Sequence, residues 1–150
     1  MDDDEYFQTL PTYFAGAAGF ITNAAGEVLI VKPNYRETWG FPGGVLEAGE
    51  TPHEGAAREV LEEIGLRLPV GRLLVVDWVL PAGRIPRGMV NFVFDCGTLE
   101  PPPGGFTLQV EELDDARFYP PAEAATLLAP RTAPRVAAAL KARATGGTEY

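Results

Sequence analysis

Residues 44–66 of the chain read GVLEAGETPHEGAAREVLEEIGL. Within this stretch Thr51 is a favourable N-cap for a helix, and Pro52 suits the first helical position. Glu54 can complete a capping box with Thr51, and Gly65 supplies the left-handed conformation that ends many helices. The stretch therefore predicts a helix that begins at Pro52 and stops at Gly65.

Three carboxylates share one face of this predicted helix. At about 100° per residue, Glu62 and Glu63 lie within about 60° of Glu59, and the apolar residues occupy the opposite side. Like charges at these spacings repel each other by a few tenths of a kcal/mol, so stability alone does not favour them. Clustered hard oxygen ligands suit Mg²⁺ or Mn²⁺, and no Cys or His group offers a zinc site. The pattern predicts a divalent-metal site.

The glycine-rich segment before the helix belongs to the same unit. Residues 39–50 read WGFPGGVLEAGE and end in an acidic side chain. The adjacent Gly43 and Gly44 let the backbone approach a ligand closely and leave carbonyl oxygens free to bind a cation. We therefore expect a loop here that completes the site on the helix.

The spacing of these residues resembles the box that defines the Nudix family. The match covers 23 of 150 residues and extends over every defined position of the box. WGFPG, directly before it, is also typical of the family. The matching positions are Gly44, five residues, Glu50, seven residues, Arg58-Glu59-Val60, one residue, Glu62-Glu63, one residue, and Gly65-Leu66.

This resemblance implies an α+β fold, an α/β/α sandwich with a mixed β-sheet. It also implies Mg²⁺- or Mn²⁺-dependent hydrolysis of a phosphoanhydride bond in a nucleoside diphosphate linked to another moiety, by in-line attack of water on phosphorus. ADP-ribose, a nucleotide sugar, a nucleoside triphosphate and a dinucleotide polyphosphate all remain open as substrates. The alternative is a non-catalytic nucleotide-sensing module on the same fold. Such modules usually lose box carboxylates, and this chain has lost none.

The resemblance also implies roles for single residues. The metal ligands are Glu59, Glu62 and Glu63, with the carbonyl of Gly44 as an additional ligand. Arg58 orients a catalytic carboxylate, and Glu50 is its supporting partner. The candidates for the general base are the box residues Glu59 and Glu62 and, as a second choice, Glu112 or Glu111 in a later acidic loop.

Substrate-binding candidates come from outside the box. Arg84 and Arg87 flank Ile85-Pro86 in a loop between two predicted strands, where they can reach a phosphate or simply increase solubility. Trp39, Tyr35 and Phe14 can stack on a base or pack in the core.

The rest of the chain predicts one domain over residues 1–150. Turn residues between apolar runs predict a hairpin, and two later runs rich in Val, Leu and Phe predict strands that pair with each other. Residues 1–8 and 145–150 are expected to be flexible tails. The predicted strands are residues 14–22, 27–32, 73–80, 89–95 and 116–119, and the further helices are residues 122–128 and 134–144.

Charge and composition limit the classes of molecule that the protein can bind and the compartment in which it is expected. The formal net charge of −9 argues against a nucleic-acid polymer, because such binding depends on Lys and Arg neutralising phosphates. A small nucleotide-like anion remains compatible if a cation accompanies it. No apolar run approaches the roughly 20 residues that span a membrane, and the acidic start is unlike a secretory signal. The lone Cys96 fits a reducing, cytoplasmic location. The oligomeric state stays open, a homodimer included.

Overall fold

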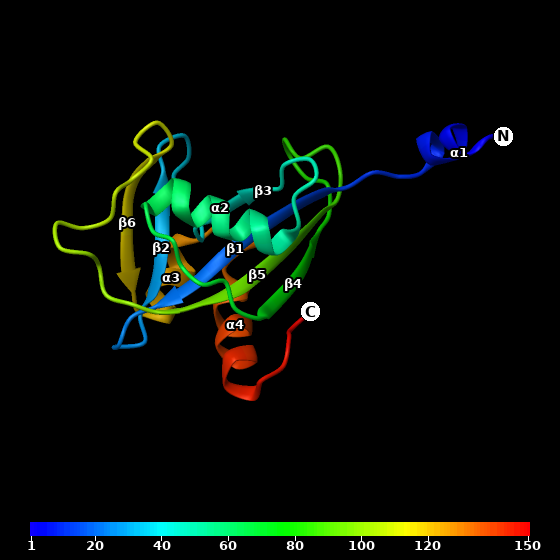
Figure 1. The fold of residues 1–150 in the computed structure, drawn as a ribbon. Coiled ribbons are helices and arrows are strands. Elements are labelled where there is room, and N and C mark those ends of the chain that lie inside the picture. The colour runs from blue at the N-terminus through cyan, green and yellow to red at the C-terminus, as the bar shows by residue number, and fades with distance from the viewer.

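The chain folds around one mixed β-sheet with helices on both faces, as seen in a computed structural model of residues 1–150 (Figure 1). The elements in chain order are α1 (Asp3–Thr9), β1 (Phe14–Thr22), β2 (Val28–Pro33), β3 (Gly43–Val45), α2 (Pro52–Ile64), β4 (Leu73–Val79), β5 (Met89–Thr98), β6 (Leu113–Tyr119), α3 (Pro121–Leu127) and α4 (Pro134–Thr145).

The sheet has the order β4-β5-β1-β2-β6, with β3 paired to β1 beside this path. β1 and β5 are parallel, and the other pairs are antiparallel. The expected hairpin of β1 and β2 and the expected pairing of β4 with β5 are both confirmed. β3 pairs with residues 16–18 of β1, whereas β2 pairs with β1 at Thr22. On one side of β1 the sheet therefore divides between β2 and β3, and β3 carries Gly43 and the first box residue, Gly44. We call this place the divided edge of the sheet.

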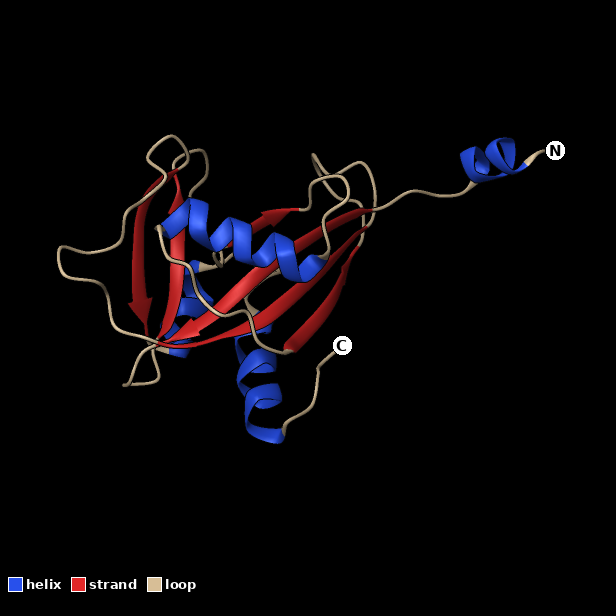
Figure 2. Ribbon diagram, viewed as in Figure 1, coloured by secondary structure: helices blue, strands red, loops and turns tan.

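Alternation along the strands separates two apolar cores, because successive side chains point to opposite faces of a sheet. Phe20 of β1 and Ile30 of β2 pack with side chains of α3 and α4. Their neighbours Ile21 and Leu29 pack with Val60 of α2. Figure 2 shows α2 on one face and α3 and α4 on the other, which confirms the α/β/α sandwich. None of the helices combines the length and apolar character needed to cross a membrane.

Both ends of the chain have backbone structure in segments that the sequence predicts to be flexible tails. Residues 3–9 form α1, whose capping box joins Asp2 and Glu5, although no residue of this helix is buried and it extends away from the sheet (Figure 1). At the other end, the Thr148 hydroxyl donates to the Leu73 carbonyl, and the Glu149 carbonyl accepts from the backbone of β4. The C-terminal segment can pair with β4 because the edge of that strand offers unpaired backbone groups.

Two strand boundaries also differ from the prediction. The glycine-rich approach was expected to be a loop, but Gly43–Val45 forms β3 against β1. β6 starts at Leu113 rather than at residue 116, so Asp115 is a strand residue and lies opposite Lys32 of β2. In both places a neighbouring strand supplies hydrogen bonds that outweigh the weak β-propensity of Gly and Asp.

Candidate active site

α2 has the boundaries that its caps predict. The Thr51 hydroxyl accepts from the backbone of Glu54 at 3.2 Å, and the Glu54 carboxylate accepts from the backbone of Thr51 at 3.3 Å. At the other end Gly65 has φ 75°, the left-handed region that favours glycine. α2 therefore begins and ends where the sequence predicts.

Arg58 lies at the centre of a cluster of carboxylates. It binds Glu50 with two parallel hydrogen bonds, Nε to Oε2 at 2.7 Å and Nη2 to Oε1 at 3.0 Å. Its Nη1 donates to Glu59 at 2.9 Å and to Glu62 at 3.2 Å. Hydrogen bonds from Arg58 lower the pKa of Glu50 to about 2, and those to Glu50 hold the pKa of Arg58 above its ordinary range. The guanidinium therefore stays charged and restrains three box carboxylates.

Glu63 is far more buried than the helical wheel suggests. β3 packs over that side of α2, which leaves Glu63 only 6% exposed, and its carboxylate accepts from the backbone of Gly43 at 3.3 Å. Burial, with the charge of Glu59 second, raises the pKa of Glu63 to about 8. Burial also raises the pKa of Glu59. The three carboxylates on this face therefore differ in their exposure to solvent, and only Glu62 is well exposed.

Gly44 lies directly against the carboxylate of Glu59. A Cβ atom placed on Gly44 would come within 2.6 Å of Glu59 Oε1, so no other residue fits without displacing that carboxylate. The bare backbone of β3 and the acidic face of α2 therefore adjoin. Carboxylate oxygens are ligands that Mg²⁺ and Mn²⁺ prefer, and here the Glu59 carboxylate lies directly against the backbone of β3.

As the side chains stand, no group of three or more His, Cys, Asp or Glu residues is arranged to hold a metal ion. Glu59 and Glu62 both point to Arg58, and Glu63 points to the backbone of β3.

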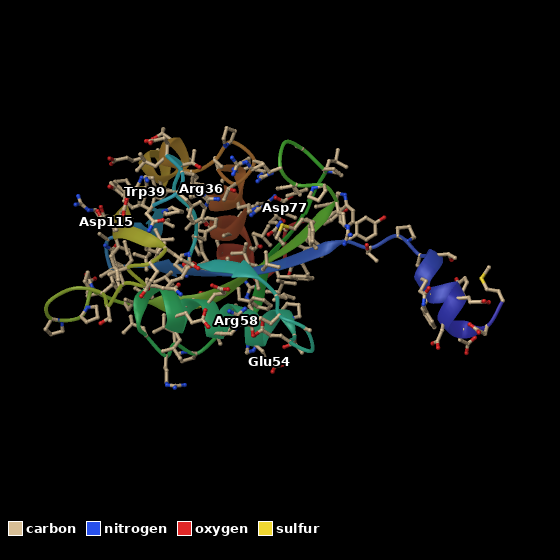
Figure 3. All side chains as sticks on the ribbon, turned by 90° about the horizontal axis from the view of Figure 1, so that it is seen from above. Arg36, Trp39, Glu54, Arg58, Asp77 and Asp115 are labelled. Carbon is tan, nitrogen blue, oxygen red and sulfur yellow. The ribbon has the colours of Figure 1, made fainter.

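Figure 3 shows Arg58 on α2, on the opposite side of the sheet from Arg36 and Asp77.

The structure brings Glu112 close to the box, although it lies 48 positions after the last residue of α2 in sequence. The backbone N–H of Gln109 donates to the carbonyl of Glu63 at 3.1 Å, which anchors the loop before β6 to the end of α2. The Glu112 carbonyl accepts from Asn34 at 2.8 Å. Held in this way, the charge of Glu112 contributes to the raised pKa values of Glu59 and Glu63. Its neighbour Glu111 makes no such contribution.

A pocket of about 270 Å³ lies between β3 and the start of α4. Its polar lining includes Arg36, Arg131 and Arg135, and Tyr35 also borders it. Gly44 lines the pocket and also contacts Glu59. The strand β3 therefore separates the pocket from the carboxylates and borders both.

Most of the substrate-binding residues expected from the sequence lie outside this pocket. Trp39 packs edge-on against Tyr119 with ring centroids 5.4 Å apart, beside the core, and does not line the pocket. Arg84 and Arg87 are exposed in the loop between β4 and β5. Of the two residues between them, only Ile85 lines the pocket. Arg87 lies over the ring of Phe14. Of the three aromatic candidates, only Tyr35 reaches the pocket.

The pocket arginines were not identified from the sequence. Arg36 precedes the box, whereas Arg131 and Arg135 come from the connection into α4 and its first turn. No periodic pattern or motif joins these positions. Their only shared signal is that they are basic in an acidic chain, and the fold is needed to bring them together.

The buried Glu63 predicts a pH-dependent stability of the metal-free protein. Because its pKa is raised from 4.5 to about 8, the folded state holds a proton that the unfolded state releases. Stability is therefore greatest below the unfolded pKa and falls as the pH rises toward about 8. We expect the Tm in EDTA to fall by several degrees between about pH 5 and about pH 8, at about 2–4 °C per kcal/mol.

Glu63→Gln should flatten this profile, because glutamine has no proton to lose. The matched control Glu123→Gln, at an exposed side chain of α3, should leave it unchanged. A wild-type profile that rises over the same interval, or a Glu63→Gln profile as steep as wild type, would contradict the assignment.

Comparison with known proteins agrees with this geometry. A family model described as NUDIX domain matches residues 12–140. A MutT-like protein of Streptomyces ambofaciens is 40% identical over 86 residues, which are 57% of this chain and 53% of that protein. An RNA pyrophosphohydrolase of Yersinia enterocolitica is 41% identical over 72 residues, 48% of this chain and 41% of that protein. The chain spans roughly half or less of the length of these curated relatives.

Among solved structures, the MutT protein from Methanosarcina mazei Go1 matches with a TM-score of 0.74. Its sequence is 21% identical, and the match covers 89% of this chain and 96% of that one. This likeness supports the fold.

Proposed function

The chain belongs to the Nudix family, and we propose on that basis that it hydrolyses a phosphoanhydride bond in a nucleoside diphosphate linked to another moiety. The observation that carries the proposal is the complete box on α2. Glu59, Glu62 and Glu63 all remain, and the guanidinium of Arg58 holds two of them. A sensing module without activity has no need for this full set of acidic groups.

Mg²⁺ or Mn²⁺ is the proposed cofactor, and the residues present fit it. Glu59, Glu62 and Glu63 would hold the ion together with the carbonyl of Gly44, whose missing side chain leaves room beside Glu59. When bound, such an ion neutralises phosphate oxygens and lowers the pKa of the attacking water. The acidic face of α2 then attracts, through the cation, a substrate that it would otherwise repel.

We assign the general base to Glu59 or Glu62. Burial raises the pKa of Glu59, which makes its ionised carboxylate a stronger proton acceptor. Arg58 is the positioning residue for both candidates, and Glu50 holds Arg58 in turn. Glu112 remains the second choice, supported by its electrostatic influence on Glu59.

The proposed substrate is a small nucleotide-like molecule. A pocket of about 270 Å³ beside β3 offers room for one sugar or base, and the net charge of −9 disfavours a nucleic-acid polymer. Arg84 and Arg87 remain proposed contacts for parts of the substrate that project from the pocket. We also expect a reducing, cytoplasmic setting, because the single Cys96 cannot form a disulfide within the chain.

The test is a screen of nucleoside diphosphate derivatives with Mg²⁺ or Mn²⁺. ADP-ribose, nucleotide sugars, nucleoside triphosphates and dinucleotide polyphosphates should be included, with products separated by chromatography. Cleavage of at least one class between two phosphorus atoms is the expected result. Metal-dependent binding of these compounds without turnover would instead identify a sensing module.

Arg58→Lys is expected to lower kcat by at least roughly tenfold, about 1.4 kcal/mol of transition-state stabilisation. Lysine keeps the charge but loses the paired hydrogen bonds to Glu50, so Glu59 is no longer held in one orientation. Steady-state kinetics and the Tm of the variant are the measurements, and the fold should survive. Arg67→Lys is the matched control, at an exposed arginine just beyond α2. Wild-type kcat in Arg58→Lys would show that Arg58 does not position the base.

A further inference from the structure

The pocket beside β3 differs in charge from the rest of the molecule. The chain has 12 basic and 21 acidic residues, yet three arginines and no aspartate or glutamate line this pocket. Arg36, Arg131 and Arg135 come from two separate segments of the sequence. A basic pocket in so acidic a protein points to an anionic occupant.

The hydrogen bonding of these arginines leaves most of their donors free. Arg135 is held through Nε alone, which donates to Asp77 at 2.7 Å, and neither of its Nη groups has a partner in the protein. Its side chain is only 11% exposed, so this ion pair fixes its direction. Arg36 donates only through Nε, to the Thr38 carbonyl at 3.2 Å. Arg131 is exposed and makes neither a hydrogen bond nor an ion pair with the protein.

We propose that this pocket binds an anionic group, a carboxylate or a phosphate, on the part of the substrate remote from the cleaved diphosphate. The inference rests on the proposed function, because it is the same substrate that reaches across β3 from the carboxylates of α2. Gly44 borders both regions, so the two ends of one molecule can occupy them together.

The donors of the pocket favour an anion over a neutral sugar or base. Guanidinium groups pair with carboxylate and phosphate oxygens through parallel hydrogen bonds, and such charge-assisted bonds are roughly twice as strong as neutral ones. Arg135 is already oriented by Asp77, so little freedom is lost when an anion binds. A neutral group would cover the charged donors without matching them, at a cost in desolvation.

Two matched pairs of compounds test the proposal and separate its two sources of charge. UDP-glucuronic acid differs from UDP-glucose by a carboxylate, and 2′-phospho-ADP-ribose differs from ADP-ribose by a phosphate. We expect kcat/KM with Mg²⁺ to favour the charged member of at least one pair by at least about tenfold, mainly through KM. Calorimetric Kd values in EDTA should show the same preference without turnover.

Variants of the pocket arginines then test whether the pocket causes the preference for charged compounds. Arg131→Gln should reduce the preference for the charged member at least about fivefold. Arg131→Lys should reduce it less, because lysine keeps the charge but loses the parallel hydrogen bonds of the guanidinium. Arg135→Gln, with its Tm recorded because of the Asp77 pair, should act in the same direction. Arg67→Gln is the matched control and should have no effect, since Arg67 lies outside the pocket.

The outcomes separate this proposal from the proposed function. Hydrolysis of charged and neutral compounds at equal efficiency, or a preference that both Arg131→Gln and Arg135→Gln leave intact, overturns the anion pocket while the hydrolase stands. Binding in EDTA with an Arg131-dependent preference, but no hydrolysis of these four compounds or of any class in the substrate screen, supports the pocket and overturns the hydrolase. Failure of all four compounds to bind or react overturns the pocket.

Discussion

Excess EDTA is expected to reduce hydrolysis to the background rate, a loss of at least about a thousandfold, and added Mg²⁺ or Mn²⁺ should restore it. The physical reason lies in the charge of the site. In the proposed site, Glu59, Glu62 and Glu63 would lie beside the anionic diphosphate, and Arg58 neutralises only part of their charge. Without a cation, these carboxylates would weaken binding of the diphosphate, and no ion would activate water.

Two further measurements check the same prediction. Activity should rise toward alkaline pH, because the attacking water must lose a proton and Mg²⁺ lowers its pKa only modestly. Mg²⁺ should also raise the Tm, since a ligand that binds the folded state at about 100 times its Kd stabilises it by about 2.7 kcal/mol. Undiminished turnover in EDTA would contradict the metal site, and an unchanged Tm would show that the ion binds the free protein weakly or binds only together with substrate.

Glu62→Gln is expected to lower kcat by at least about a hundredfold, about 2.7 kcal/mol of transition-state stabilisation. Glu62 is the most exposed of the box carboxylates, with 43% of its side chain accessible, and its one partner is Arg58. Removing its charge also relieves repulsion along α2. The metal-free Tm should therefore be unchanged or slightly higher, and the rise induced by Mg²⁺ should shrink.

Glu123→Gln is the control for this variant, because it removes one exposed carboxylate on the opposite face of the sheet. Its kcat and its response to Mg²⁺ should match wild type. Glu63→Gln should lose kcat to a similar degree, and glutamine can still accept from the backbone of Gly43. If either active-site variant melts well below wild type without metal, that carboxylate stabilises the fold and does not belong to the metal site.

The box was readable from the sequence because its information is local. Capping depends on residues three positions apart, so Thr51 and Glu54 predicted the start of α2, and Gly65 predicted its end. The hairpin and the pairing of β4 with β5 were equally local, since each joins neighbouring strands through one loop. Helical periodicity placed Glu59, Glu62 and Glu63 near one another before any tertiary contact was considered.

Burial within the site was not readable in this way. Helical periodicity does not distinguish the surroundings of Glu63 from those of Glu62, but β3 covers one side of α2 and buries Glu63 most deeply of the three carboxylates. Glu112 reaches the box because the loop before β6 is hydrogen-bonded to the end of α2. These contacts form between segments far apart in the chain, and their energies depend on the whole sheet being assembled.

The family, the helix with its acidic face and the layered α+β fold thus follow from short-range patterns of charge, glycine and apolar residues. The surroundings of each carboxylate and the position of the pocket beside β3 were decided only by the tertiary structure. Arg36 and Arg135 have no local relation to each other, and both line one pocket because the sheet divides at β3 and α4 packs beside that division. Specificity depends on such long-range packing, which a sequence pattern of neighbouring residues does not record.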